Sequence, residues 1–258
     1  MDFFSKNSNV VKIGVWGPPG SGKSTYLTML QYADCQGWKI RPRGDQTIEL
    51  YLEYGEIIRD HLKFIPQTIP NEVSYLTFDF EEPKGFIRNR QYRVILPEAS
   101  GEHYERPETR PELMQEMSRY QGIIWLVDPE RIDNPPPRGR GYRRMIQEWL
   151  NRLYEMHGGN TLPQYMAFCL TKMDLPGHSE YINNPEYYCL EKLGKDVALF
   201  LDNFCDPAKV EFFATSSIGF KDDTMESTID LEDRSKLRYP AEPVNLFTPF
   251  LWLFNSIR

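Results

Sequence analysis

Features that would mark a secreted, membrane or nucleic-acid-binding protein are scarce in this sequence of 258 residues. Its four cysteines stand singly, with no CxxC pair and no Cys/His spacing typical of a metal site, so we expect reduced thiols in a cytoplasmic protein. No run approaches the roughly 18 apolar residues that span a bilayer, which argues against integral membrane association. Basic residues number 30 against 37 acidic ones, and a net charge of −7 argues against a general nucleic-acid binder.

What the sequence does have is the composition of an ordinary globular domain, with 40% hydrophobic and 14% aromatic residues. Short apolar runs alternate with longer periodic segments, a pattern that predicts an α/β fold with a largely parallel sheet and helices on both faces. No repeat or change of composition divides the chain, so we expect one domain over residues 1–258. Strands are expected at Val10–Trp16, Val73–Phe80, Gln91–Leu96, Gly122–Val127, Tyr165–Leu170 and Val210–Ala214, and helices at Gly22–Tyr32, Glu49–Phe64, Met145–Met156, Pro185–Phe204 and Leu246–Phe254.

Three stretches interrupt this alternation, and we interpret them as insertions. Residues 33–70 form a long segment that holds the expected helix at Glu49–Phe64. Residues 133–144 are rich in Pro, Gly and Arg, a composition that predicts an irregular loop, either solvated or open to a partner. Residues 218–243 carry many acidic side chains and show no apolar period.

Residues 17–24 read GPPGSGKS and match the phosphate-binding pattern GxxxxGK[ST] at every required position. The pattern follows an apolar strand and opens a helix, as its mechanism requires. The glycines let backbone N–H groups turn toward phosphate oxygens, and the helix N-terminus adds partial positive charge. Lys23 is expected to bridge the β- and γ-phosphates, and the Ser24 hydroxyl to ligate Mg²⁺. The expected nucleotide contacts of this loop are Pro19, Gly20, Ser21, Gly22, Lys23, Ser24 and Thr25.

A second motif, Thr171-Lys172-Met173-Asp174, follows the strand expected at Tyr165–Leu170. Open α/β sheets bind ligands at the carboxyl ends of their strands, where this aspartate lies. Its two carboxylate oxygens match two adjacent donors on the guanine edge, a pair that adenine lacks. The stem of Lys172 can pack along the purine face. This motif therefore predicts a preference for guanine.

In their order along the chain, these motifs resemble those of the Ras-like P-loop GTPases. The segment TKMD is similar to the family's [N/T]KxD element, with Thr171 in place of the more frequent Asn. The segment PEASG at 97–101 is similar to the DxxG element, with Glu98 replacing Asp, and Thr215-Ser216-Ser217 is similar to the loop whose backbone contacts the guanine carbonyl. The resemblance implies a three-layer P-loop NTPase fold with a Ras-like sheet, with GTP or GDP as ligand and Mg²⁺ as cofactor.

The resemblance also implies roles for single residues. Glu98 would hold the hydration shell of Mg²⁺, and the Gly101 N–H would meet the γ-phosphate. Thr68 is the best-placed candidate for the switch I threonine that ligates Mg²⁺, and the alternative that it is an ordinary loop residue between two prolines stays open. Ser24, Thr68 and Glu98 make up the expected magnesium site. A protein effector or regulator is the expected partner.

The pattern departs from the family at the residue after Gly101. Ras-like enzymes commonly carry there the glutamine that orients the attacking water, and this chain has Glu102. A carboxylate can accept from water but cannot donate to the γ-phosphate as an amide does. Either hydrolysis is slow, or another group such as His103 takes over. The residues expected to act in hydrolysis are Lys23, Thr68, Gly101, Glu102 and His103.

Residues 128–131 (DPER) and the glutamate after Gly101 look similar to bacterial GTPase domains of the double-GTPase type, which implies a switch that works with a partner protein. The leading hypothesis is a regulatory GTPase. A nucleotide-binding interaction module with little turnover is an alternative, motivated by Glu98 and Glu102. A P-loop ATPase or kinase is a third, and it must treat the two guanine motifs as coincidences. If Glu98 is not the magnesium carboxylate, Asp128 is the next candidate.

Overall fold

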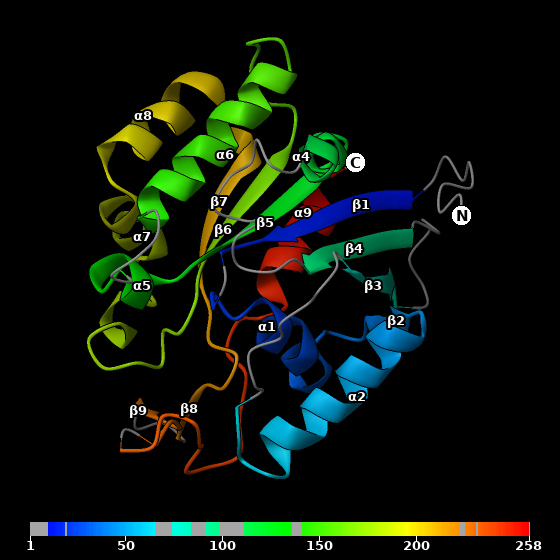
Figure 1. Cartoon of the computed structure of the whole chain (residues 1–258), viewed down its shortest axis with the longest axis vertical. Coiled ribbons are helices and arrows are strands. Elements are labelled where there is room, and N and C mark those ends of the chain that lie inside the picture. Colours follow the sequence, from blue (N-terminus) through cyan, green and yellow to red (C-terminus); the bar gives the residue numbers. More distant parts are fainter. Residues whose placement is uncertain are drawn as a thin grey trace.

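The fold is known from a computed structural model that describes residues 10–18, 20–64, 74–83, 91–98, 111–135, 141–221, 225–230 and 232–257, with only the backbone of Ser74, Pro97 and Glu98. Figure 1 shows a twisted central sheet with helices on both sides and a small orange hairpin set apart from it. The expected three-layer α/β architecture is confirmed.

The main sheet has the strand order β2-β3-β4-β1-β5-β6-β7 over the described part of the chain. β1 pairs in parallel with both β4 and β5, and β6 and β7 continue the parallel part. β3 runs antiparallel to β2 and β4, so β3 and β4 form a hairpin. The strands are β1 (Val10–Trp16), β2 (Lys39–Arg43), β3 (Ser74–Glu81), β4 (Gln91–Glu98), β5 (Gly122–Val127), β6 (Tyr165–Leu170) and β7 (Val210–Ala214), and β8 (Phe220–Lys221) pairs with β9 (Glu226–Ser227) in the hairpin.

Two apolar cores lie on opposite faces of the main sheet. One core joins the sheet to α1 (Lys23–Met29), α2 (Asp45–Arg59) and α9 (Thr248–Ser256). The other joins it to α4 (Pro111–Met117), α6 (Tyr142–Met156), α7 (Pro185–Leu193) and α8 (Lys195–Phe204). The short elements are α5 (Pro129–Asp133) and the 3-10 turns Leu30–Tyr32, Ser179–Tyr181 and Pro207–Lys209. Among the described helices, none is both long and apolar enough to cross a bilayer.

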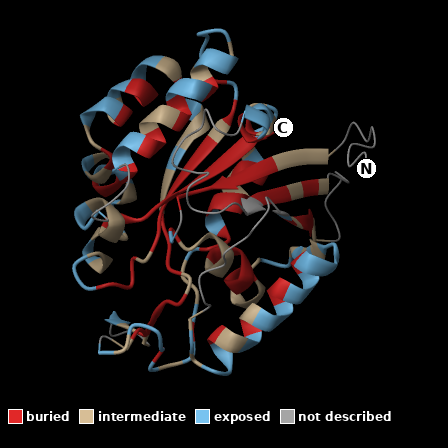
Figure 2. Cartoon of the chain, viewed as in Figure 1, coloured by how far each residue is buried: buried red, intermediate tan, exposed pale blue. Residues whose placement is uncertain are grey.

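The central strands are buried because helices cover both of their faces, and Figure 2 shows them in red through the middle of the molecule. All six residues of β5 are buried. Ile124 and Leu126 belong to the core beneath α1 and α9, whereas Ile123 and Trp125 belong to the core beneath α6. Parallel strands with two covered faces read as continuous apolar runs, which is why the sequence predicts β5 and β6 at their observed bounds. The mostly apolar β1 and β7 also have their predicted bounds, although both are partly exposed.

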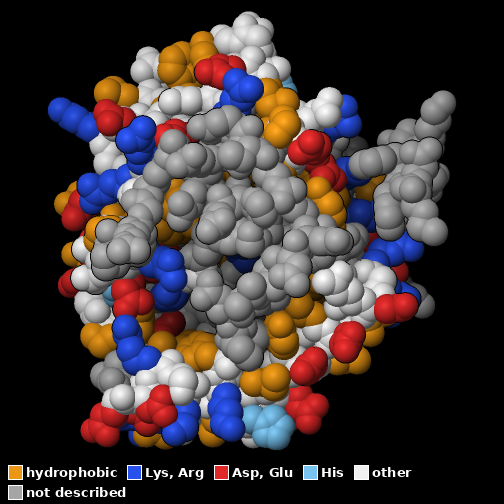
Figure 3. Space-filling view, viewed as in Figure 1, with side chains coloured by type: hydrophobic (Ala, Val, Ile, Leu, Met, Phe, Trp, Pro, Cys, Tyr) orange, Lys and Arg blue, Asp and Glu red, His pale blue; other side chains and the backbone are white. Residues whose placement is uncertain are grey.

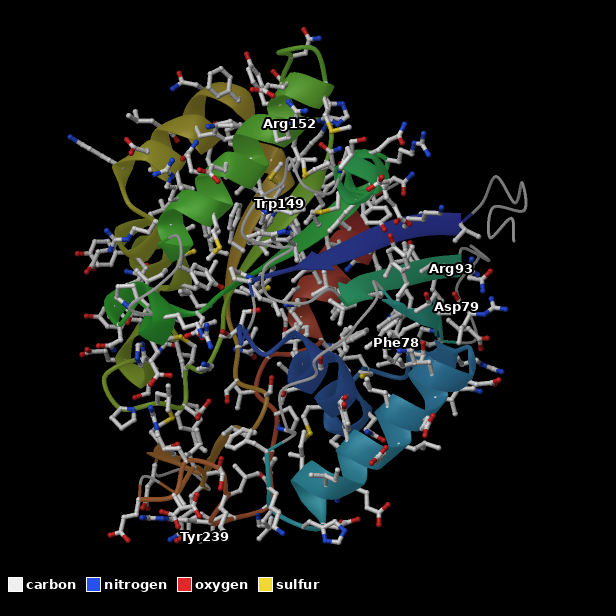
Figure 4. All side chains as sticks on the ribbon, viewed as in Figure 1. Phe78, Asp79, Arg93, Trp149, Arg152 and Tyr239 are labelled. Carbon is white, nitrogen blue, oxygen red and sulfur yellow. The ribbon has the colours of Figure 1, made fainter. Side chains whose placement is uncertain are left out.

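The segment before β3 adds a strand that the sequence analysis does not predict. β2 lies at the edge of the sheet, and its burial alternates between exposed Lys39, Arg41 and Arg43 and half-buried Ile40 and Pro42. The buried carboxylate of Asp79 on β3 joins β2 to β4, because it pairs with Arg43 at 2.6 Å and with Arg93 at 2.8 Å (Figure 4). The following helix α2 begins and ends earlier than the predicted Glu49–Phe64.

Two further predictions need correction, one of a helix and one of a loop. The single helix expected over Pro185–Phe204 is broken at Gly194, whose φ of 85° is incompatible with a continuous α-helix, so α7 and α8 are separate. Residues 133–144 are not irregular throughout, because α5 ends at Asp133 and α6 begins at Tyr142. Tyr142 is fixed there by its hydroxyl, which donates to the Leu126 carbonyl at 2.6 Å. Residues 136–140 lie outside the described part.

Charged side chains of both signs are interspersed over the visible face of the molecule (Figure 3). Lys209 and Lys221 stack on tyrosine rings, and several surface arginines pair with neighbouring carboxylates. Such exposed pairs contribute little to stability individually. The buried aromatic side chains of the two cores are therefore the better target for a stability test.

We predict that Trp149→Ala lowers the free energy of unfolding by about 3–5 kcal/mol, since it empties a site in the core where the ring lies 5.5 Å from that of Trp16. Arg152→Ala, on the same helix, is the matched control and should change stability by less than about 0.5 kcal/mol. Arg152 pairs only with exposed Glu155 among the described residues (Figure 4). Urea unfolding measures both, and equal losses would contradict this account of the core.

Candidate nucleotide-binding site

The phosphate loop connects the buried end of β1 to the first turn of α1. The Lys23 ammonium donates to the carbonyls of Gly17 and Pro18 at 2.7 and 3.1 Å, so it lies folded back against the loop. Ser24 and Thr25 follow in the first turn of α1, both half-buried. The structure therefore places these three predicted residues together. Pro19 lies outside the described residues.

Two glycines of this loop have left-handed backbone conformations that other residues rarely adopt. Gly22 has a φ of 87°, and nothing approaches the position that a side chain there would take. Gly20 has a φ of 74°, and the Arg131 guanidinium occupies the space where its Cβ would lie. Arg131 thus brings a positive charge against the phosphate loop, a role that the sequence analysis does not assign.

The predicted base-reading aspartate lies at the carboxyl end of β6. Asp174 is 3% exposed, and its Oδ1 accepts from the Ser216 hydroxyl at 2.5 Å. The Ser227 hydroxyl donates to Oδ2 at 3.4 Å. Burial raises the pKa of the Asp174 carboxyl above its usual range, although the hydrogen bonds from Ser216 and Ser227 act in the opposite direction. Both oxygens are thus held in a fixed direction.

The loop after β7 is joined to the loop after β6. The Thr215 hydroxyl and N–H both donate to the Leu170 carbonyl, at 2.9 and 2.8 Å, and the Met173 N–H donates to the Thr215 carbonyl. Ser216 also accepts from the Gly219 N–H, which fixes its hydroxyl for the bond to Asp174. The two predicted guanine motifs therefore form one structural unit, with Ser217 next to it in sequence.

Lys172 joins this unit to β5. Its φ is 58°, and its ammonium pairs with Asp128 Oδ2 at 2.6 Å and with Glu130 Oε2 at 3.6 Å. Asp128 is fully buried, and its Oδ1 accepts from the Arg131 N–H to cap α5. Asp128 is therefore committed to Lys172 and α5. Asp128 is also the magnesium candidate that the sequence offers as the alternative to Glu98.

Glu130 connects these contacts to Arg234, which lies 104 residues later in the chain. Its Oε1 pairs with Arg234 Nη1 at 2.6 Å. Burial raises the pKa of Glu130, but Arg234 and Lys172 together bring it below its usual value, so the carboxylate stays charged. The sequence analysis assigns no role in this site to Arg131, Arg234 or Ser227. Arg234 and Ser227 lie in no local motif, and the DPER segment that contains Arg131 does not show which residue the guanidinium contacts.

Several predicted residues cannot be compared with the structure. Thr68, Gly101, Glu102 and His103 lie outside the described residues, and of Glu98 only the backbone, at the end of β4, is described. Of the expected magnesium ligands, Ser24 alone has a described side chain. Within the described ranges, no three His, Cys, Asp or Glu side chains cluster as a metal site.

Among solved structures, the chain is similar to the signal recognition particle receptor SRb-GTP/SRX complex from Chaetomium thermophilum, with 13% identity and a TM-score of 0.48 over 96% of this chain and 98% of that chain. It is also similar to the S. cerevisiae Ski7 GTPase-like domain bound to GTP, with 11% identity and a TM-score of 0.46 over 96% of this chain and 50% of that chain. No curated protein matches it.

The family match is more informative, since it includes both the phosphate loop and the base-reading motif. Residues 11–216 match the family described as Double-GTPase 2, and these residues make up most of the chain. The match extends from the second residue of β1 to Ser216, the serine that holds Asp174. The chain belongs to the Double-GTPase 2 family.

Proposed function

We propose that this protein binds GTP or GDP with Mg²⁺ and works as a regulatory switch, hydrolysing GTP slowly or with the help of a partner. The observation that carries the proposal is the environment of Asp174. Its carboxylate lies at the end of β6, in the same parallel sheet as the strand that leads into the phosphate loop, with β5 alone between them. Serine hydroxyls hold both of its oxygens.

This arrangement suits guanine for a simple reason of hydrogen-bond count. An ionised carboxylate offers about four lone-pair positions. Ser216 and Ser227 each hold one oxygen and so fix the direction of the carboxylate toward the two adjacent N–H donors of guanine. Adenine has no such pair of donors and would give this buried carboxylate no hydrogen bond from the base, which is costly. The proposal therefore includes selection of GTP over ATP.

The phosphate end combines donors and positive charge. Lys23 can turn from the loop carbonyls to the β- and γ-phosphates, and the guanidinium of Arg131 lies against the same loop at Gly20. Ser24, with a hydroxyl in the first turn of α1, would hold Mg²⁺ together with Glu98 and Thr68. The ion neutralises charge on the phosphates when bound. Hard oxygen ligands of this kind are those that Mg²⁺ prefers.

Turnover depends on residues after β4. Glu102 would accept a hydrogen bond from the attacking water, and His103 is the group proposed to orient that water. The Gly101 N–H would meet the γ-phosphate. A carboxylate near the γ-phosphate repels it, so we expect slow intrinsic hydrolysis and an effect of a partner protein on the rate. An interaction module without turnover is the alternative that the same two glutamates, Glu98 and Glu102, support.

The first test is nucleotide selection and turnover by the purified protein with Mg²⁺. Binding of GTP over ATP with slow phosphate release is expected, and binding without release would support the interaction module. Lys23→Ala should weaken GTP binding by roughly a hundredfold, as expected for loss of a charge-assisted contact. Lys195→Ala, an exposed lysine on α8, should leave it unchanged. Unchanged binding by Lys23→Ala would refute the phosphate-loop assignment.

Asp174→Asn tests the proposed recognition of the guanine base by Asp174. The amide offers one acceptor oxygen in place of two, and its NH₂ group can donate to the carbonyl that xanthine carries in place of the 2-amino group. We expect GTP affinity to fall by roughly tenfold or more, because one hydrogen bond to a charged group is lost. Affinity for xanthosine triphosphate should rise. Asp196→Asn on exposed α8 is the matched control. If the Asp174 variant still prefers GTP to the xanthine nucleotide, the base-reading role is wrong.

Glu98→Ala tests the magnesium carboxylate. We expect the variant to need a higher Mg²⁺ concentration for half-maximal GTP binding, because one negative group near the ion is lost. A magnesium titration of GTP binding measures this, with the exposed Glu112→Ala as control. An identical titration in wild type and the Glu98 variant would contradict the assignment.

A further inference from the structure

The predicted insertion near the C-terminus contains a folded segment that contacts the nucleotide site from outside the sheet. We call the described residues 225–230 and 232–238 the cap. The cap contains β9, and in Figure 1 it lies with β8 at the bottom of the view, away from the main sheet. The cap is an ordered structure, since Ile229 and Leu237 are buried and paired, and the Thr228 hydroxyl lies within hydrogen-bond distance of the carbonyls of Ile218 and Gly219.

The cap reaches the base-reading carboxylate through one side chain. Ser227 on β9 donates to Asp174 Oδ2, the oxygen that Ser216 does not hold. The Ser227 hydroxyl also accepts from the Ile229 N–H at 3.2 Å, so its position is set by the backbone of the cap. A carboxylate held at both oxygens cannot rotate, which fixes the direction of its remaining lone pairs. The cap therefore contributes to the alignment of Asp174, together with Ser216.

A second contact fastens the cap to the loop after β5. Arg234 pairs with Glu130, which in turn lies 3.6 Å from Lys172 of the base-reading motif. Beside this pair is a pocket of about 500 Å³, and its lining residues are Glu130, Asp133, Asn134, Leu175, Pro176, His178 and Arg234. Arg234 borders this pocket, so the Arg234–Glu130 ion pair attaches the cap to the loop after β5 at the edge of the pocket.

A third contact joins the cap to the segment after α2. The Phe64 N–H donates to the Ser235 carbonyl at 3.0 Å, and the Leu237 N–H donates to the Leu62 carbonyl at 2.8 Å. Lys63 and Lys236 form an antiparallel bridge between these bonds. Phe64 is four residues before Thr68, the expected switch I threonine. The cap thus links that segment of the chain to the base-reading loop.

We propose that the cap retains the guanine nucleotide, with Ser227 as a positioning residue for Asp174 and the Arg234–Glu130 pair as its fastening. The proposal rests on the proposed function, since it concerns how the same site holds its base. Detachment of the cap loosens Asp174 and also releases the strand-like pairing of residues 62–64. Nucleotide release and movement of the segment that leads to Thr68 are therefore coupled.

Release of a fluorescent GDP analogue from the full chain tests the fastening. Arg234→Gln should release the analogue roughly two- to fivefold faster than wild type, as expected for a partly exposed ion pair. Arg238→Gln is matched to it, because Arg238 also lies in the cap, loses the same charge and pairs only with Asp230 among the described residues. It should release at the wild-type rate. Equal rates in the two variants, or slower release by Arg234→Gln, would overturn the proposal.

Ser227→Ala tests the positioning role with a readout that a general loss of stability would not move. Inosine diphosphate lacks the 2-amino group of guanine, so the ratio of GDP to inosine diphosphate affinity measures how well Asp174 is aligned. We expect this ratio to fall roughly three- to tenfold, the loss of about one hydrogen bond. Ser235→Ala keeps the backbone bond to Phe64 and should leave the ratio unchanged. An unchanged ratio in Ser227→Ala would remove the positioning role.

The coupling has its own measurement, amide hydrogen exchange in peptides that hold Phe64 and Leu237. GDP should slow exchange of both amides in wild type and less so in Arg234→Gln, whereas equal protection in both proteins would contradict the coupling. Failure of the proposed function is separable, because it shows in wild type as no preference for GDP over ADP. Preference for GDP in wild type together with unaltered variants would reject the cap alone.

Discussion

The candidate site is organised around the ion pair between half-buried Lys172 and fully buried Asp128. A fully buried carboxylate without a partner is strongly destabilising, so this pair has to persist for the two strand ends to stay as they are. Each oxygen of Asp128 has a different task. Oδ2 holds Lys172 of the base-reading motif, while Oδ1 caps α5 and thereby directs Arg131 to the phosphate loop. The loop after β6, which is proposed to meet the base, and the phosphate loop are therefore connected through a single side chain.

The sequence predicts this fold well where a strand is a mostly apolar run. β1, β5, β6 and β7 have their expected bounds, since their apolar runs and the motifs that follow them are local signals. β2 is missed because its residues alternate between charged and apolar types at a sheet edge. The break at Gly194 is missed because one glycine inside an apolar periodic segment does not reveal its φ. Ser227 is 53 residues from Asp174, and Arg234 is 104 from Glu130, so only the folded chain brings them together.

The departure from the more frequent asparagine at position 171 has a local physical explanation. The Thr171 N–H and hydroxyl both donate to the Val127 carbonyl, at 2.8 and 3.3 Å. Thr215 makes the equivalent pair of bonds to Leu170 at the end of the next strand. Two threonines thus bind successive strand ends in the same way, and the loops that follow them carry Lys172 and Ser216. The rigidity of the base-reading loops originates in the sheet itself.

The edge strand β2 limits how other proteins can associate with this domain. A strand at a sheet edge offers unpaired backbone groups to any passing chain, and proline and charged side chains are the usual protection against such addition. β2 has both, with Pro42 lacking an N–H and with Lys39, Arg41 and Arg43 exposed. Its outer side is thus a poor template for intermolecular β-pairing, and the opposite edge at β7 has no proline within Val210–Ala214. Association by strand addition would be directional, with growth disfavoured at one end of the sheet.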